Sequence, residues 1–244
     1  MPHALEEARY ELTVANRIVA HEGVLDAFGH ISMRHPLHPD RYLLSCSRAP
    51  EFVEPADVLE FTLDSTPVTQ TEIALYGERV IHGEIYKARP DVSAVCHHHS
   101  TAILPFCIAD IELIPVYHQG ATLGTKAPVW DSRVEFGNTN IMVITPDEGA
   151  SLARALGANW IVLMRRHGAT VVGTSIRECV FRSIYSHRNA EIQWKSQLLG
   201  KIEPLNQIEA EKAGPHNLKP IPIARAWEYW SRRLEKADEM PARY

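Results

Sequence analysis

Two histidines that stand two residues apart offer the clearest chemistry in this sequence. His97 and His99 lie in the segment SAVCHHHS, whose apolar start predicts a buried β-strand. Alternate side chains of a strand leave on one face, so these two imidazoles lie roughly 6–7 Å apart while His98 points the other way. Such a pair can bind one divalent ion at about 2.1 Å from each nitrogen. A polar strand end whose histidines face water is the alternative.

A catalytic metal site that keeps an open position needs a third protein ligand, and His167 is the candidate. It ends the apolar run WIVLM and precedes Gly168, so it has the same place at a strand end as the histidine pair. Taken alone, it is equally an ordinary turn histidine. The three together predict one divalent metal ion per chain. Zinc is the first choice, and manganese, cobalt and iron suit three imidazoles as well.

Glu78 is the predicted catalytic acid or base. It lies in TEIALYGERVIHGEIYKARP, whose apolar stripe predicts a helix that Pro90 ends. Glu78 borders that stripe, and partial burial there would raise its pKa toward the range useful for proton transfer. His82, one turn later, is placed to orient it. A solvated surface glutamate is the alternative.

The remaining segments predict strands and helices that interleave. Helical spacing is found over 5–21, 175–199 and 226–237, and strand-like runs over 30–35, 41–47, 58–64, 93–100 and 160–173. Residues 110–150 are rich in Gly, Pro and Asp and predict a loop-rich segment. This order favours an α/β fold with helices covering a central sheet. We expect a single domain over 1–244, with a C-terminal helical extension over about 203–244.

The composition excludes several classes of function. The 244 residues carry a net charge of -5 with both signs scattered, so neither nucleic acid nor a membrane surface is an expected partner. No run approaches the roughly 20 apolar residues of a membrane span. The N-terminus has acidic residues where a signal peptide has a basic start. The cysteines (Cys46, Cys96, Cys107 and Cys179) form no pair typical of a zinc ribbon or a disulfide framework. We expect a cytoplasmic protein that acts on a small molecule.

Three segments together resemble the class II aldolase and adducin family: GHISMR, GERVIHGEIYKARPDVSAVCHHHS and LMRRHGATVVG. The similarity runs from about residue 5 to about residue 200. The resemblance implies a three-layer αβα sandwich with a central mixed, mostly antiparallel sheet, usually assembled as a homotetramer. It also implies His97, His99 and His167 as metal ligands and Glu78 as the acid or base, the same residues that their spacing favours.

The chain departs from the sugar-phosphate aldolases of that family where those enzymes hold a phosphate. His30 replaces an asparagine, the turn SCSRAP contains Arg48, and Tyr76 and Gly77 replace hydroxyl residues before Glu78. The motifs GHIS, SxSRAPE and VYHQG are more similar to the branch that decarboxylates hydroxylated aromatic acids, such as dihydroxyphthalate decarboxylase.

The resemblance therefore implies a metal-dependent lyase that decarboxylates a carboxylated phenol or catechol. Loss of CO2 beside the ion leaves a carbanion whose charge spreads onto a bound oxygen as a metal-stabilised enolate, and Glu78 protonates the carbon. Arg48 is a candidate to hold the substrate carboxylate through its planar fork. His30 and His118 are candidates to bond a phenol or carboxylate. Tyr117 stands near the position of the family's proton-donating tyrosine.

Three other functions remain open. A class II aldolase would cleave or form a carbon–carbon bond in a hydroxy-carbonyl substrate with the same site. A non-heme iron oxygenase is possible on the same fold, since three histidines and a glutamate also suit Fe(II). An adducin-like scaffold protein would keep the fold but lose the ligands, which this chain retains.

Overall fold

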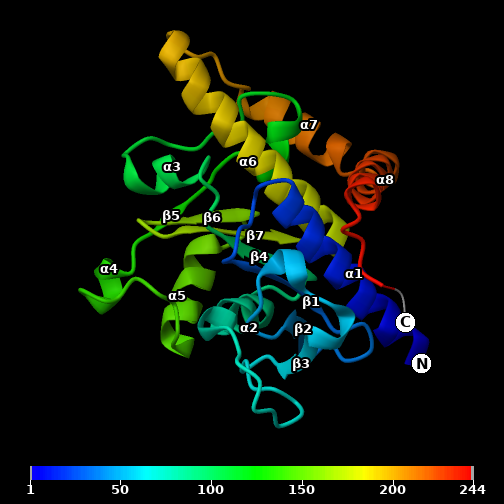
Figure 1. Cartoon of the computed structure of the whole chain (residues 1–244). Helices are drawn as coiled ribbons and strands as arrows, with labels where there is room; N and C mark the ends of the chain where they lie inside the picture. The colour runs from blue at the N-terminus through cyan, green and yellow to red at the C-terminus, as the bar shows by residue number, and fades with distance from the viewer. Residues whose placement is uncertain (1, 243–244) are drawn as a thin grey trace.

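The computed structural model describes residues 2–242, and in this part of the chain a seven-stranded sheet lies between two layers of helices (Figure 1). The strands are β1 (His30–Arg34), β2 (Arg41–Ser45), β3 (Val58–Thr62), β4 (Ala94–His98), β5 (Val129–Trp130), β6 (Ile161–Met164) and β7 (Gly168–Gly173). The helices are α1 (Pro2–His21), α2 (Val80–Ala88), α3 (Leu104–Ile108), α4 (Arg133–Phe136), α5 (Pro146–Leu156), α6 (Ile176–Leu199), α7 (Gln207–Asn217) and α8 (Pro220–Ala237). Short 3-10 turns are η1 (Pro50–Phe52), η2 (Pro55–Asp57), η3 (Gly77–Arg79) and η4 (Gln119–Leu123). The expected domain of 1–244 includes residues 1, 243 and 244, which lie outside the described residues.

The strands of the sheet follow the order β3-β2-β1-β4-β7-β6-β5. β5 runs parallel to β6, and the other neighbouring pairs are antiparallel. The sheet is therefore mixed and mostly antiparallel, as the family resemblance predicted. β4 lies at its centre, between β1 and β7, which buries the strand that leads to the histidine pair.

Side chains along the strands alternate between the two faces of the sheet. On β4, Cys96 packs with apolar residues of α1 and α6, whereas Val95 packs with those of α2 and α5. On β2, Leu43 joins the first group and Leu44 the second. Helices thus cover both faces, and the predicted three-layer αβα sandwich is confirmed.

The helix predicted over residues 71–90 is wrong for the part before Val80. The structure has a 3-10 turn at Gly77–Arg79 and an α-helix only from Val80. Tyr76 is extended (φ -59°, ψ 132°), and the backbone carbonyl of Ala74 accepts a hydrogen bond from the Ser47 N–H at 2.8 Å. That bond holds the segment against the loop after β2, so its apolar residues form no helical face. Glu78 consequently lies in a tight turn at the start of α2, not within a helix.

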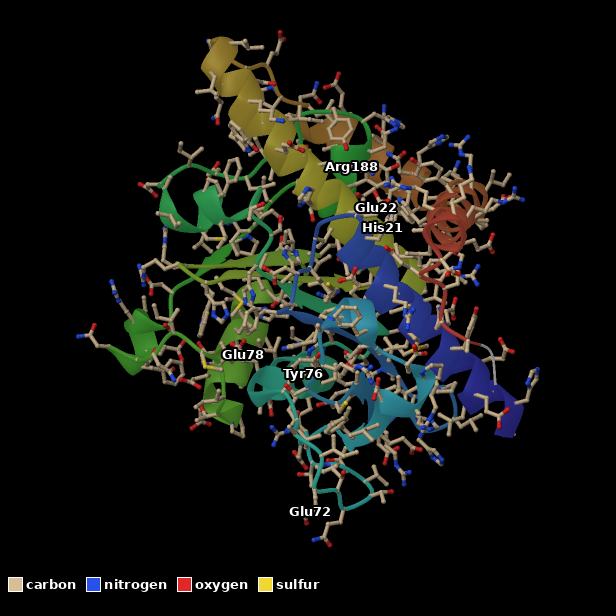
Figure 2. All side chains as sticks on the ribbon, viewed as in Figure 1. His21, Glu22, Glu72, Tyr76, Glu78 and Arg188 are labelled. Atoms are coloured by element: carbon tan, nitrogen blue, oxygen red, sulfur yellow. The ribbon has the colours of Figure 1, made fainter. Side chains whose placement is uncertain are left out.

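The C-terminal segment forms two helices, α7 and α8, and α8 packs on α1 and α6. Trp230 and Leu234 of α8 are buried in the same apolar cluster as residues of α1. Beside this cluster, Glu22 pairs with Arg188 of α6 at 2.6 Å (Figure 2). Glu22 also pairs with Arg233 of α8 at 2.8 Å. Among the helices of residues 2–242, none combines the length and the apolar composition that crossing a membrane requires.

Candidate metal centre

Three histidines and one glutamate meet at one end of the central strands. His97 ends β4 with His98, His99 follows the strand, and His167 lies in the turn between β6 and β7. Because β4 and β7 are paired, their ends bring His99 and His167 together. Glu78 reaches the same point from η3, and the four ligand atoms lie within 4.8 Å of one another. The structure thus brings together the four residues that the sequence favoured.

The three imidazole nitrogens are spaced as ligands of one ion. His99 Nε2 lies 3.1 Å from His97 Nε2 and 3.0 Å from His167 Nε2. Ligands about 2.0–2.1 Å from a tetrahedral ion would be about 3.3 Å apart. The Nδ1 atom of His167 donates to the carbonyl oxygen of Ile141 at 2.8 Å, which leaves a lone pair on its Nε2. The donor set therefore fits a divalent cation.

Burial keeps two of these histidines ready to bind metal. It lowers the pKa of His97 below its ordinary value and lowers that of His99 to about 4. Burial also acts on His167, but the hydrogen bond and charge of Glu78 outweigh it and raise its pKa. Neutral imidazole is the form that binds a metal ion, so His97 and His99 need lose no proton near pH 7.

Glu78 is oriented by the histidines and by a backbone amide. Its two carboxylate oxygens lie 3.5 Å from His97 Nε2 and 3.5 Å from His167 Nε2, and Oε1 accepts the N–H of Val143 at 2.9 Å. Burial raises the pKa of Glu78, but His97 and His167 outweigh that effect and hold the pKa well below its ordinary value. The expected rise is therefore wrong. A carboxylate among histidines stays ionised, which suits a proton acceptor or a neighbour of a cation.

A pocket of about 340 Å³ opens over this cluster. Among its lining residues are Phe28, His30, Arg48, Tyr76, Glu78, His99 and Met142. Figure 2 shows Tyr76 and Glu78 close to each other at the start of α2. The sequence predicted His30 and Arg48 at the site but missed Phe28 and Met142, residues that are 69% and 42% exposed. A single apolar residue in a loop carries no sequence signal that marks it as part of a pocket.

Arg48 keeps part of its guanidinium free. Its Nη1 atom bonds the carboxylate of Asp57 at 2.9 Å, and within residues 2–242 no partner bonds its Nε or Nη2. Its backbone also contacts the hydroxyl of Tyr76, which fixes the loop on the pocket wall. The side chain is therefore anchored at one nitrogen and open to a ligand at the others.

His30 lies directly opposite His97 on the neighbouring strand, and their ring centroids are 5.2 Å apart. His82, which we expected to orient Glu78, instead contacts His30. The Nε2 atom of His82 lies 2.6 Å from Nδ1 of His30, and its Nδ1 lies 2.6 Å from Oγ of Ser32. Because α2 begins after Glu78, His82 is turned toward the sheet and away from the carboxylate.

Tyr117 and His118 lie apart from this cluster in the same chain. The Tyr117 ring is close to Gly120, and burial, with Tyr185 next in effect, raises its pKa. The carbonyl of His118 accepts a bond from Asn217 at 2.9 Å. Both residues thus lie against α6 and α7, and neither is among the described residues that line the metal pocket.

Residues 10–194 match the profile of the family described as Class II Aldolase and Adducin N-terminal domain. The chain is 36% identical over 234 residues to Decarboxylase tropJ of Talaromyces stipitatus, covering 87% of this chain and 88% of that protein. It is 28% identical over 192 residues to the 3,4-dihydroxyphthalate decarboxylase of Arthrobacter keyseri, covering 72% and 73%. An aldolase II superfamily protein from Pseudomonas syringae has the same fold, with a TM-score of 0.81, 21% identity and coverage of 97% and 95%.

Proposed function

This chain belongs to the class II aldolase and adducin family, and on that premise we propose that it is a metal-dependent decarboxylase of hydroxylated aromatic carboxylic acids. The observation that carries the proposal is the group of His97, His99, His167 and Glu78, whose ligand atoms lie within 4.8 Å of one another beneath an open pocket. The names of two similar proteins, both decarboxylases, favour loss of CO2 over aldol cleavage.

The pocket wall suits an aromatic acid. Arg48 offers its unpaired guanidinium nitrogens to a carboxylate, and such charge-assisted bonds are stronger than neutral ones. Phe28 and Met142 present exposed apolar side chains at the same pocket, where an aromatic ring can cover them. A phosphate dianion would instead need several backbone and hydroxyl donors, whose expected positions hold His30, Tyr76 and Gly77.

His97, His99 and His167 would hold the divalent ion, with zinc as the first choice. When bound, the ion supplies a Lewis acid that stabilises negative charge on an adjacent substrate oxygen. Glu78, ionised at the start, accepts the proton of a substrate hydroxyl. Glu78 then gives that proton to the ring carbon that bears the carboxylate. The carbon–carboxylate bond breaks next, CO2 leaves with its oxygens, and the bonding electron pair restores the aromatic ring and the charge on the substrate oxygen. Solvent then reprotonates the product hydroxyl.

We extend the proposal to the assembly, a homotetramer with each site near a subunit boundary. Tyr117 and His118 lie away from the metal pocket of their own chain, against α6 and α7. In this proposal they act at the pocket of a neighbouring copy, where Tyr117 would pass the solvent proton to the product hydroxyl and His118 would bond the substrate.

The test is a screen of hydroxylated benzoates and phthalates for CO2 release by the metal-loaded protein. We expect CO2 from at least one acid with a hydroxyl next to or opposite the carboxylate. The release should stop when the ion is removed by a chelator and return when the ion is restored. Release of CO2 that is indifferent to the chelator would contradict the metal dependence.

A further inference from the structure

A hydrogen-bonded chain runs from the pocket wall into the core between β1 and α2. His30 Nδ1 lies 2.6 Å from His82 Nε2, His82 Nδ1 lies 2.6 Å from Ser32 Oγ, and Ser32 Oγ lies 2.8 Å from Tyr86 Oη. All four residues are buried, from 0% to 3% exposed. Such a chain has a direction, because each contact holds one hydrogen that points one way.

The inner end of the chain decides this direction. Within residues 2–242, Ser32 Oγ is the one hydrogen-bond partner of Tyr86 Oη, so two contacts join His82 Nδ1, Ser32 and Tyr86. The two hydroxyl groups bring two hydrogens. If His82 Nδ1 also carried a hydrogen, three hydrogens would share two contacts and one buried donor would lack an acceptor. That costs about 1–3 kcal/mol.

The favoured direction therefore starts at the phenol. Tyr86 donates to Ser32, Ser32 donates to His82 Nδ1, and the remaining hydrogen of His82 is on Nε2. His82 Nε2–H then donates to His30 Nδ1, so a neutral His30 carries its hydrogen on Nε2.

The Nε2 atom of His30 opens into the pocket. None of the described residues bonds to this nitrogen, and the nitrogen is not fully buried. His30 itself lines the pocket beside Glu78 and His99. Its ring is fixed by contacts with Tyr76 and His97, at centroid distances of 4.6 and 5.2 Å.

We infer that Ser32, His82 and Tyr86 are positioning residues that hold His30 as a neutral donor, with its Nε2–H aimed at an anionic oxygen of the substrate. The inference about substrate rests on the proposed function and deepens it. A fixed donor selects substrates that present a carboxylate or phenolate oxygen at this wall, and it disfavours those that present another donor there. Burial supports the neutral state of the inner histidine, since it lowers the pKa of His82 to about 3.

The direct test is nitrogen NMR of the metal-loaded, full-length protein with 15N-labelled histidine. The His30 signals are assigned by their loss in His30→Gln. We expect His30 to have a protonated Nε2 and an unprotonated Nδ1. A protonated Nδ1, alone or together with Nε2, overturns the inference. This measurement needs no substrate, so it stands even if no aromatic acid is decarboxylated and the proposed function fails.

Variants test whether the hydrogen-bonded chain sets the tautomer of His30. Ser32→Ala removes the link to Tyr86, so we expect both tautomers of His30 to appear. Tyr42→Phe is the matched control. The Tyr42 hydroxyl is equally buried in the same core, but it bonds Ser65, which is not part of the hydrogen-bonded chain. If Ser32→Ala does not fold, His82→Phe removes the partner of His30 and should give the same mixture. A single, unchanged tautomer in the variant that folds overturns the positioning role.

Turnover supplies a second readout. The substrate binds the donor tautomer, so KM should rise in inverse proportion to the fraction of that tautomer, about twofold for an even mixture, while kcat and bound metal stay near their original values. A fall in kcat with unchanged KM would contradict a role in substrate binding. The Tyr42→Phe protein should match the original protein in KM.

Discussion

The imidazole of His167 donates from Nδ1 to the backbone carbonyl of Ile141 at 2.8 Å, and Ile141 holds a left-handed backbone conformation with φ 70°. β-branched residues rarely adopt this conformation, which costs of order 1–3 kcal/mol. Two residues later, the N–H of Val143 bonds Glu78. One short, strained loop thus orients both a candidate metal ligand and the candidate proton carrier.

Substitutions of Ile141 test this loop. The proline ring fixes φ near -65°, so Ile141→Pro cannot keep the carbonyl in place. We expect metal affinity to fall about 10–100-fold, the usual effect of losing a bond that orients a ligand. Asparagine tolerates the left-handed conformation, so Ile141→Asn should retain the affinity. The measurement is a competition titration with a chelator, and equal affinities in the two variants would contradict the role of the loop.

The histidine ligands are tested by metal content. We expect His99→Ala to lose most of its bound divalent ion, because its Nε2 atom lies about 3 Å from the same atom of both other histidines. His38→Ala, which removes an exposed histidine outside the pocket, is the control and should keep the full content. Elemental analysis that finds undiminished metal in the His99 variant would remove that residue from the site.

The role of Glu78 is tested by replacing its carboxylate with an amide. Glu78→Gln keeps the acceptor for the N–H of Val143 but cannot carry the proton. We expect folding and metal content to persist and kcat to fall about 10²–10⁴-fold, the usual contribution of general acid–base catalysis. Glu84→Gln, which removes a carboxylate that pairs with Lys87, should have near-normal kcat. A near-normal kcat in the Glu78 variant would assign the proton to another group.

Buried His82 predicts how stability changes with pH. Burial lowers its pKa to about 3, whereas in the unfolded chain it titrates near 6.5. Between these values the unfolded state binds the extra proton, so the free energy of unfolding falls as the pH falls from about 6.5 to about 3. Each such group contributes about 1.4 kcal/mol per pH unit within that window.

Urea unfolding of the metal-free protein at several pH values measures this dependence without competition from the ion. His82→Phe removes one titrating group, so its stability should fall less steeply on acidification. Identical slopes for the two proteins between pH 6 and pH 4 would mean that His82 is not the group responsible.

Much of the geometry of the candidate site was predictable because its histidines lie at or next to the ends of strands. The alternation of β4 places His97 on the face of α2 and α5, and the strand-end position of His167 brings it beside His99. The resemblance to the family added the three-layer fold with its mixed, mostly antiparallel sheet. Neither step needed long-range information beyond the pairing of strands.

The errors share a physical cause. The segment before Val80 has apolar residues at helical spacing, but the bond from Ser47 to Ala74 comes from a distant loop, which no local pattern reveals. The pKa of Glu78 depends on histidines that only the fold brings near, so burial alone gave the wrong direction. The hydrogen-bonded chain that joins His30 to Tyr86 likewise depends on the packing of α2 on β1.

The central claim is decarboxylation of an aromatic acid, and product analysis in heavy water tests it most directly. The metal-loaded protein is incubated without oxygen in D2O with 3,4-dihydroxyphthalate or related hydroxybenzoates, and separately with fuculose and ribulose phosphates. We predict one CO2 for each aromatic acid consumed, one deuterium at the ring carbon that lost it, and no aldehyde from the sugar phosphates. Aldehyde from a sugar phosphate with no CO2 from any aromatic acid would contradict the account, as would turnover of the aromatic acids that requires oxygen.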